Sequence, residues 1–152
     1  MLDQLVSHRV VIKPLPYAND RNCAVLGTIK KLKHAKVIWK MPFNECLEKY
    51  QISAVVFEFA STPLYEAIGE DIEIFTILDP NVPFGEEPIK LLKKRVHCFD
   101  TLEDFKKALE LYCKGALPKL RNDEFYLKYV YKENMSELIL NTLENLLKPQ
   151  FR

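Results

Sequence analysis

Short apolar runs alternate with amphipathic segments along most of the chain. Runs rich in β-branched and aromatic residues predict five strands, at residues 9–12, 36–39, 53–59, 73–78 and 95–99. Between and after them, apolar residues at helical spacing predict helices at residues 23–32, 44–50, 64–68, 89–93 and 102–114. Strands and helices that alternate in this way form βαβ units with parallel strands. We therefore expect an α/β fold: a single three-layer, Rossmann-like domain over residues 1–152, with about five mostly parallel strands and helices on both faces.

Capping residues and a glycine mark the two ends of the helix predicted at 102–114. Asp100 or Thr101 can cap the helix that follows them, and acidic residues in its first turn favour the same start. Gly115 is a natural stop for that helix. An aromatic-rich segment, 124–132, then leads to an amphipathic helix at 133–147, which we expect to pack back on the domain.

The segment from Val55 to Asp79 has the strongest functional pattern, because it predicts strand, turn, helix and strand in succession. Ser61 or Thr62 can open the helix, with Pro63 at its first position. In an open α/β sheet, ligands bind at the carboxyl ends of the strands, and free amides at a helix start attract phosphate. We expect phosphate binding there in addition to capping.

Four further side chains follow or flank these strands. Glu66 lies about one turn inside the helix and can reach a ribose or sugar hydroxyl. Glu58 sits in an apolar strand, where it is either exposed at the strand end or a cleft carboxylate whose raised pKa suits acid–base chemistry. Asp79 either caps its loop or acts in catalysis, and Phe84 either packs or stacks on a base. Glu58 and Asp79 are the catalytic candidates.

Composition narrows the class of partner. The 22 basic and 21 acidic side chains give a net charge of +1, which argues against a protein that binds nucleic acid or anionic membrane by bulk charge. No apolar run approaches the roughly 20 residues that span a bilayer, and the N-terminus lacks a signal-peptide layout. We therefore expect a cytoplasmic protein with no nucleic-acid partner and no transmembrane segment.

The cysteines and histidines predict neither a metal site nor a disulfide framework. The four cysteines form no CxxC pair, and the three histidines show no ligand spacing. We expect free buried thiols in a reducing compartment, no metal and no cofactor. His97 and Cys98 are strand neighbours and therefore face opposite ways, so they cannot act as a catalytic pair.

Three segments, in order and spacing, resemble the C-terminal half of bacterial GT-B glycosyltransferases of the surface-carbohydrate, capsule and teichoic-acid type. They read RVVIKPLP, FEFASTPLYEAI and ILDPNVPFGE, and the resemblance covers residues 5–115. In that family this half holds the nucleotide of the donor, and the other half binds the acceptor and supplies the base. The resemblance implies a nucleotide-sugar ligand, a second Rossmann-like domain or subunit for turnover, and peripheral membrane contact through that partner.

Carried over to matching positions, the resemblance gives four residues a role. Ser61 and Thr62 would hold the phosphates, Lys13 would counter their charge, and Glu66 would bind hydroxyls of the donor sugar or ribose. The chain departs from the family where Glu70, Asp71 and Glu73 follow the helix, because acids are compatible with a nearby diphosphate only if they point away from it.

Two other functions fit the same fold. The first is a non-catalytic binding or interaction module, since fold does not fix function. The second is a small stand-alone enzyme that uses Glu58 or Asp79, although the chain has no nucleophile elbow, P-loop or GxGxxG motif.

Overall fold

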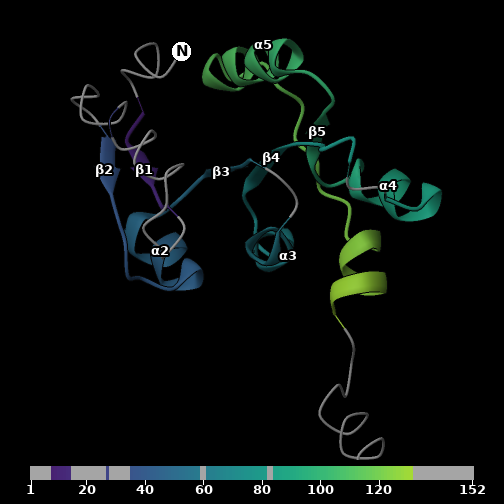
Figure 1. Ribbon diagram of the computed structural model, residues 1–152, viewed down its shortest axis with the longest axis horizontal. Coiled ribbons are helices and arrows are strands. Elements are labelled where there is room, and N and C mark those ends of the chain that lie inside the picture. The colour runs from purple at the N-terminus through teal and green to yellow at the C-terminus, as the bar shows by residue number, and fades with distance from the viewer. Residues whose placement is uncertain (1–7, 15–26, 28–34, 59–60, 82–83, 132–152) are drawn as a thin grey trace, which may run out of the picture.

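The computed structural model describes residues 8–14, 27, 35–58, 61–81 and 84–131 (Figure 1). Within them the elements follow in the order β1 (Val10–Ile12), β2 (Ala35–Val37), α2 (Phe43–Tyr50), β3 (Ala54–Phe57), α3 (Thr62–Ile68), β4 (Glu73–Ile77), α4 (Glu86–Leu92), β5 (His97–Phe99), α5 (Leu102–Cys113) and η2 (Tyr126–Val130), a turn of π-helix. The helix predicted at 133–147 and all but Gly27 of the helix predicted at 23–32 lie outside the described residues. The fold is α/β, as predicted.

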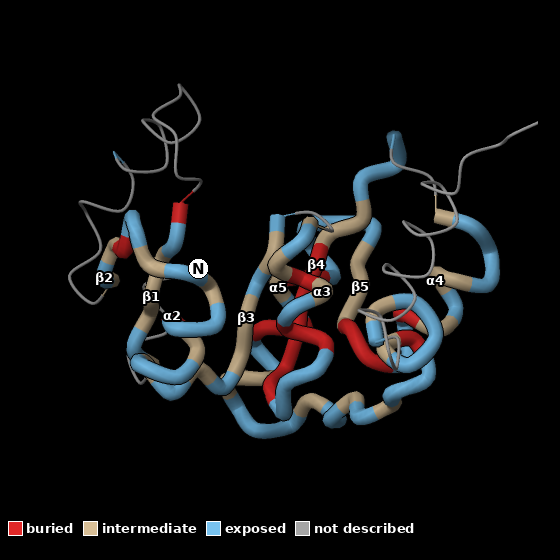
Figure 2. Tube along the Cα trace, turned by 90° about the horizontal axis from the view of Figure 1, so that it is seen from below, coloured by how far each residue is buried: buried red, intermediate tan, exposed pale blue. Residues whose placement is uncertain are grey.

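The five strands are present but form two sheets. β1 pairs with β2, and β4 pairs with both β3 and β5, all in parallel. In both views the strands lie in one row, in the order β2, β1, β3, β4, β5 (Figures 1 and 2). Within the described part of the chain, no backbone pairing joins β1 to β3. The paired strands are therefore parallel, as predicted, but the larger sheet has three strands, so the single sheet of about five strands that we expected is not found in the described residues.

Helices cover the three-stranded sheet on both faces. In Figure 1, α5 lies on one side of the row of strands, and α2 and α3 lie on the other. Because side chains alternate along a strand, β4 contributes to the packing on both faces of its sheet. Ile74 packs with Leu64 of α3 and Leu92 of α4. Phe75 packs with Phe105 of α5 on the other face. β4 is the central strand of its sheet and has the most continuous burial (Figure 2).

Helix α5 begins and ends as its sequence predicts. Thr101 has extended backbone, and its hydroxyl accepts a hydrogen bond from the Asp104 amide at 3.1 Å. Gly115 follows the helix with φ of +67°, a left-handed conformation that favours glycine. The helix predicted at 89–93 begins earlier, at Glu86, because the extended Gly85 precedes two acidic residues in its first turn.

We expect Gly115→Ala to lower the free energy of unfolding by about 1 kcal/mol. The space around Gly115 is open, so the loss comes from the left-handed backbone alone. Urea denaturation measures it, and Gly115→Asn should lose less, because asparagine tolerates this conformation better. Equal stability of the alanine variant and the parent would contradict the assignment.

After α5 the chain passes from one face of the sheet to the other. Leu117 packs with the α5 layer, whereas Phe125, which is 2 % exposed, packs with the α3 and α4 layer. We call residues 117–131 the C-terminal strap (Figure 1). The aromatic-rich segment therefore packs on the domain through Phe125.

Candidate functional site

The amino ends of β1 and β3 lie at the same edge of the row of strands. The rings of His8, just before β1, and Tyr112, on α5, have centroids 6.1 Å apart. Ser53, just before β3, has its hydroxyl oxygen 3.1 Å from the Tyr112 hydroxyl oxygen. Arg9 also donates to the Tyr50 carbonyl, three residues before Ser53, at 3.0 Å. Because one α5 residue contacts both amino ends, the loops that follow β1 and β3 lie at the opposite, carboxyl edge.

Helix α3 starts at this carboxyl edge, where the sequence predicts it. Ser61 is extended, with φ of −134° and ψ of 171°, and Thr62 begins the helix. Pro63 is the second helical residue, one position later than expected. Among the described contacts, the Ser61 hydroxyl makes no capping hydrogen bond, and Thr62 is exposed. The expected side-chain cap is therefore not formed by Ser61, which occupies the cap position through its backbone alone.

Lys13 and Glu66 both have exposed side chains near this edge. Lys13 directly follows β1 and lies close enough to Cys46 of α2 to act on its thiol. Burial raises the pKa of that thiol, and the lysine charge opposes the effect. Glu66 lies on the solvent side of α3, because Leu64 and Ala67 form the buried side. Both are therefore accessible to a ligand.

The remaining candidates at the carboxyl edge have more ordinary surroundings. Glu58 follows β3 and is exposed, so it is a strand-end carboxylate and not one buried in the strand. Asp79 accepts hydrogen bonds from the Asn81 amide at 2.8 Å and the Asn81 side chain at 2.9 Å, which is loop capping. Phe84 is half-buried and packs against the core cluster beneath α3 and α4. These contacts match the simpler of the two interpretations for each residue.

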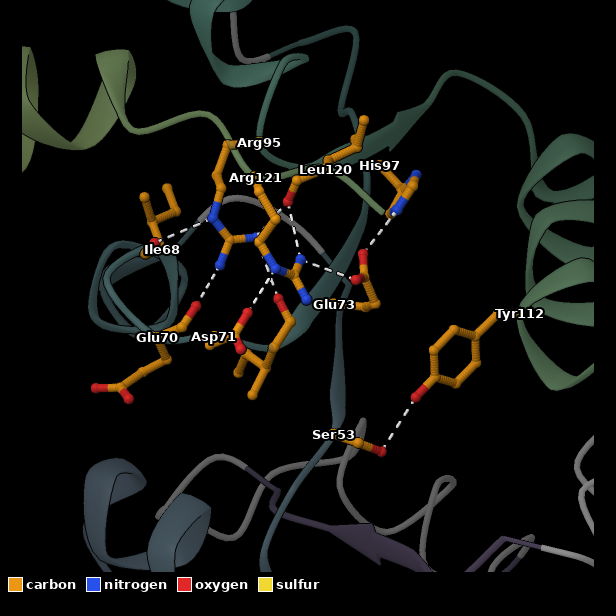
Figure 3. Close-up of polar contacts among 11 residues, drawn as sticks. Ser53, Ile68, Glu70, Asp71, Glu73, Arg95, His97, Tyr112, Leu120 and Arg121 are labelled. Carbon is orange, nitrogen blue, oxygen red and sulfur yellow. Dashed lines mark hydrogen bonds and ion pairs between the residues drawn. The ribbon is translucent and has the colours of Figure 1, made fainter. Parts of the chain in front are cut away.

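The opposite, amino edge holds a charged cluster that the sequence did not predict as a unit (Figure 3). Glu73, the first residue of β4, lies between two partners. Its Oε2 is 3.1 Å from Nε2 of His97, and its Oε1 is 2.8 Å from Nη1 of Arg121. The second contact is an ion pair without hydrogen-bond alignment. Arg121 also donates from Nε to Asp71 at 2.5 Å.

Arg95 lies beside this cluster and is 2 % exposed. Its guanidinium donates only to backbone carbonyls in the described structure, those of Ile68, Glu70, Ile72 and Leu120. Ile68 and Glu70 lie at the end of α3, so the arginine closes the carboxyl end of that helix. Burial lowers the pKa of Arg95, although an arginine remains charged at neutral pH.

The amino-edge cluster shows where the three acidic residues that differ from the GT-B pattern lie. Asp71 and Glu73 pair with Arg121 at the amino edge, and the exposed Glu70 precedes them. They therefore do not line the carboxyl edge, where phosphate binding is expected. The sequence shows Glu73 and Arg95 at the starts of two predicted strands and His97 inside one, which marks polar groups in apolar segments but not which of them meet.

Burial governs the charge state of His97. Its side chain is 10 % exposed, and this burial lowers the pKa of the imidazole. The hydrogen bond and charge of Glu73 oppose the shift, while Arg95 and Arg121 add to it. At neutral pH the ring is therefore uncharged, and its Nε2 proton is donated to the Glu73 carboxylate.

No family model, curated protein or solved structure matches this chain. Among the described residues, no helix is long and apolar enough to cross a membrane. In the same part of the chain, no group of three or more His, Cys, Asp or Glu residues is placed to hold a metal ion. The case for a function therefore depends on the geometry of the two edges and on the sequence pattern.

The thiols that the structure describes are free, as predicted, and suited to packing. Burial is the largest effect on Cys46, Cys98 and Cys113, and it raises the pKa of each thiol. For Cys98 the pKa rises to about 12. These cysteines are protonated at neutral pH and poor nucleophiles. His97 stacks on Phe75 while Cys98 packs on the other face, which confirms that they do not pair. Cys23 lies outside the described residues.

Proposed function

We propose that this chain binds a nucleotide-activated donor of the nucleotide-sugar class at the carboxyl edge between β1 and β3. One observation carries the proposal: the order of strands reverses at this point. From β1 the chain moves outward to β2, and from β3 it moves the other way through β4 to β5 (Figure 2). In doubly wound, Rossmann-like sheets such a reversal opens a crevice beyond the carboxyl ends, where ligands bind.

The side chains at this carboxyl edge suit a diphosphate joined to sugars. Lys13 supplies a cation, and the first amides and hydroxyls at Ser61 and Thr62 supply hydrogen-bond donors. Glu66 is exposed one turn further along α3, where its carboxylate can accept from ribose or sugar hydroxyls. With these donors available, the proposal requires no metal ion and no cofactor.

The resemblance to GT-B glycosyltransferases suggests what such binding is for. On this proposal the chain is the donor-binding half of a transferase in surface polysaccharide synthesis, and the reaction is glycosyl or polyol-phosphate transfer. A second Rossmann-like domain or subunit would bind the acceptor, supply the base and make any contact with a membrane surface. The reaction would take place in the cytoplasm, where nucleotide-activated donors are made.

A non-catalytic binding module is the second candidate, and three observations are compatible with it. Asp79 is occupied by Asn81, Phe84 is occupied by the core, and Glu58 is exposed at a strand end. Neither carboxylate has a partner among the described residues that would make it a general acid or base. This pattern argues against catalysis by the chain alone, and it also fits a donor-binding half.

The test is thermal stability of the purified chain with UDP-, GDP-, CDP- and dTDP-linked sugars. A ligand that binds only the folded state, at 100 times its Kd, stabilises it by about 2.7 kcal/mol and raises Tm. We expect one nucleotide class to raise Tm, and the double variant Ser61→Ala/Glu66→Ala to lose most of that rise. The matched control is Glu110→Ala, an exposed glutamate on α5, which should keep it.

The alternatives give different results. No change in Tm with any donor at millimolar concentration would contradict donor binding by this chain and favour the interaction module. A rise that survives in Ser61→Ala/Glu66→Ala would place the ligand elsewhere on the molecule.

A further inference from the structure

Charge is unevenly distributed along the chain. Between Asp20 and Glu45 there is no acidic residue, and the same stretch holds six basic ones: Arg21, Lys30, Lys31, Lys33, Lys36 and Lys40. Because the whole chain carries +1 and this stretch carries +6, the remaining residues carry −5. The near-neutral total therefore conceals a dense basic run, a pattern typical of a segment that contacts a polyanion.

The described part of this run lies at one end of the row of strands. β2 is the outermost strand in both views (Figures 1 and 2). Lys36 on β2 and Lys40 just after it are exposed, and Trp39 beside Lys40 is 37 % exposed. Lys49 is exposed near the end of the neighbouring helix α2. We call Lys36, Trp39, Lys40 and Lys49 the basic end of the row.

Tyr50, the last residue of α2, brings cations from three elements together. Nζ of Lys36 lies over its ring, 5.1 Å from the centroid. Arg9, just before β1, donates to its carbonyl at 3.0 Å, and Lys49 precedes it in the helix. The positive charge at this end is therefore gathered by the fold as well as by the sequence.

These cations have no acidic partner in the part of the chain that the structure describes. The ion pairs found there all join residues between 71 and 128, on the three-stranded side of the row and the C-terminal strap. Glu45 and Glu48 of α2 are exposed but take part in none of them. The charge of the basic end is thus available to a partner.

We propose that the basic end is a docking surface for an anionic lipid bilayer, with its lysines on the headgroups and Trp39 at the boundary between headgroups and hydrocarbon. Tryptophan is enriched at that boundary, and each lysine near an anionic bilayer strengthens binding. The inference goes beyond donor binding and does not depend on it. It assigns to this chain a membrane contact that the proposed function leaves to a second domain.

The acidic residues that balance the run lie further along the row. From Gln51 to Ile89 the chain has eight acidic residues and no basic one, and this stretch forms β3, α3 and β4. β3 and β4 lie beyond β1 (Figure 2), roughly 10 Å or more from β2 at the usual spacing of strands. Screening limits the reach of an exposed charge to about 8 Å at physiological salt. A flat bilayer that touches only the basic end therefore avoids these acids, whereas a nucleic acid that runs along the row would meet them.

The experiment is fluorescence of Trp39 in the full chain with lipid vesicles. Trp39 is the single tryptophan, so its emission reports on the basic end directly. We expect emission to shift to shorter wavelength with vesicles of equal parts phosphatidylcholine and phosphatidylserine, and not with phosphatidylcholine alone. The apparent affinity should fall as salt is added, because screening weakens the attraction.

Two double variants test which lysines are responsible. Lys36→Gln/Lys40→Gln should bind the anionic vesicles about 25-fold more weakly than the parent, about fivefold for each lysine. The matched control is Lys90→Gln/Lys93→Gln, which removes the same charge from exposed positions at α4, the other end of the row (Figure 1). The control variant should bind as the parent does.

Three results would overturn the docking surface. They are equal binding to both kinds of vesicle, binding to neither, and equal losses in the two double variants, which would mean attraction by net charge alone. In the second case, a shift with a single-stranded oligonucleotide or with inorganic phosphate would assign the lysines to nucleic acid or to a small anion. Self-association abolished by Lys36→Gln/Lys40→Gln would then assign them to the acidic elements of a second copy.

A measurement on the parent decides if Lys36→Gln/Lys40→Gln does not fold. Lipids with brominated acyl chains quench a tryptophan that reaches the hydrocarbon boundary. Quenching of Trp39 in anionic vesicles supports the docking surface, and unchanged emission contradicts it.

Discussion

Replacing Arg95 with methionine is expected to lower the free energy of unfolding by roughly 3–5 kcal/mol. Methionine can fill much of the aliphatic space but cannot donate, so the carbonyls of Ile68, Glu70, Ile72 and Leu120 lose their common donor. A buried carbonyl left without a partner costs about 1–3 kcal/mol, and water at the edge of the sheet should recover part of the loss. Urea denaturation with an unchanged m-value measures the difference.

Arg9→Met is the matched control for this loss. Arg9 is exposed, and in the described structure it donates to one carbonyl, that of Tyr50, so the same substitution should change stability by no more than about 0.5 kcal/mol. Similar losses at Arg95 and Arg9 would mean that Arg95 does not organise the end of α3 and the strap. The loss of stability for Arg95→Lys should lie between the losses for Arg95→Met and Arg9→Met, because one ammonium cannot reach all the carbonyls that lie around a planar guanidinium.

Leu64→Ala is expected to cost about 2–5 kcal/mol, the second large effect. Leu64 is completely buried in the cluster that joins α3 to β4 and α4, where it packs with Ile74 and Leu92. Truncation removes apolar contact and leaves a cavity that α3 and the sheet cannot fill without moving, because interiors are close-packed. Thermal and urea unfolding of the purified variant both measure the loss.

The control for Leu64→Ala is the same substitution on a helix that covers the opposite face of the sheet. Leu102 begins α5 and is 54 % exposed, so Leu102→Ala should stay within about 0.5 kcal/mol of the parent. A small effect at Leu64 would mean that α3 is not packed on β4 as described. The placement of the start of α3 at the carboxyl edge, on which the proposed donor site depends, would then be contradicted as well.

The two edges of the row of strands differ in how much of their structure could be predicted from the sequence. The start of α3 at the carboxyl edge was predictable because its signals are local: apolar runs end at Phe59 and Leu78, and a serine, threonine and proline open the helix between them. The amino-edge cluster was not, because His97 lies 24 residues from Glu73, and Arg121 lies 50 residues from Asp71. Sequence patterns carry no information about which distant charges meet.

The sequence by itself determined the elements and the class of fold. The strand β4, the Thr101 cap and the Gly115 stop are properties of a few neighbouring residues, and each is found where it was predicted. Parallel strands also followed, because the segments that connect them are long enough to form crossovers. Even the exposure of Glu66 follows from the apolar positions on its helix.

Tertiary structure alone decided how these elements combine. The division of the strands into sheets of two and three, the meeting of β1 and β3 at Tyr112, and the path of the strap all depend on packing between segments far apart in the chain. The same holds for His97, whose charge state is set by Glu73, Arg95 and Arg121. The physical reason is that burial and electrostatic interaction act through space, so their effect on a residue appears only after distant segments have come together.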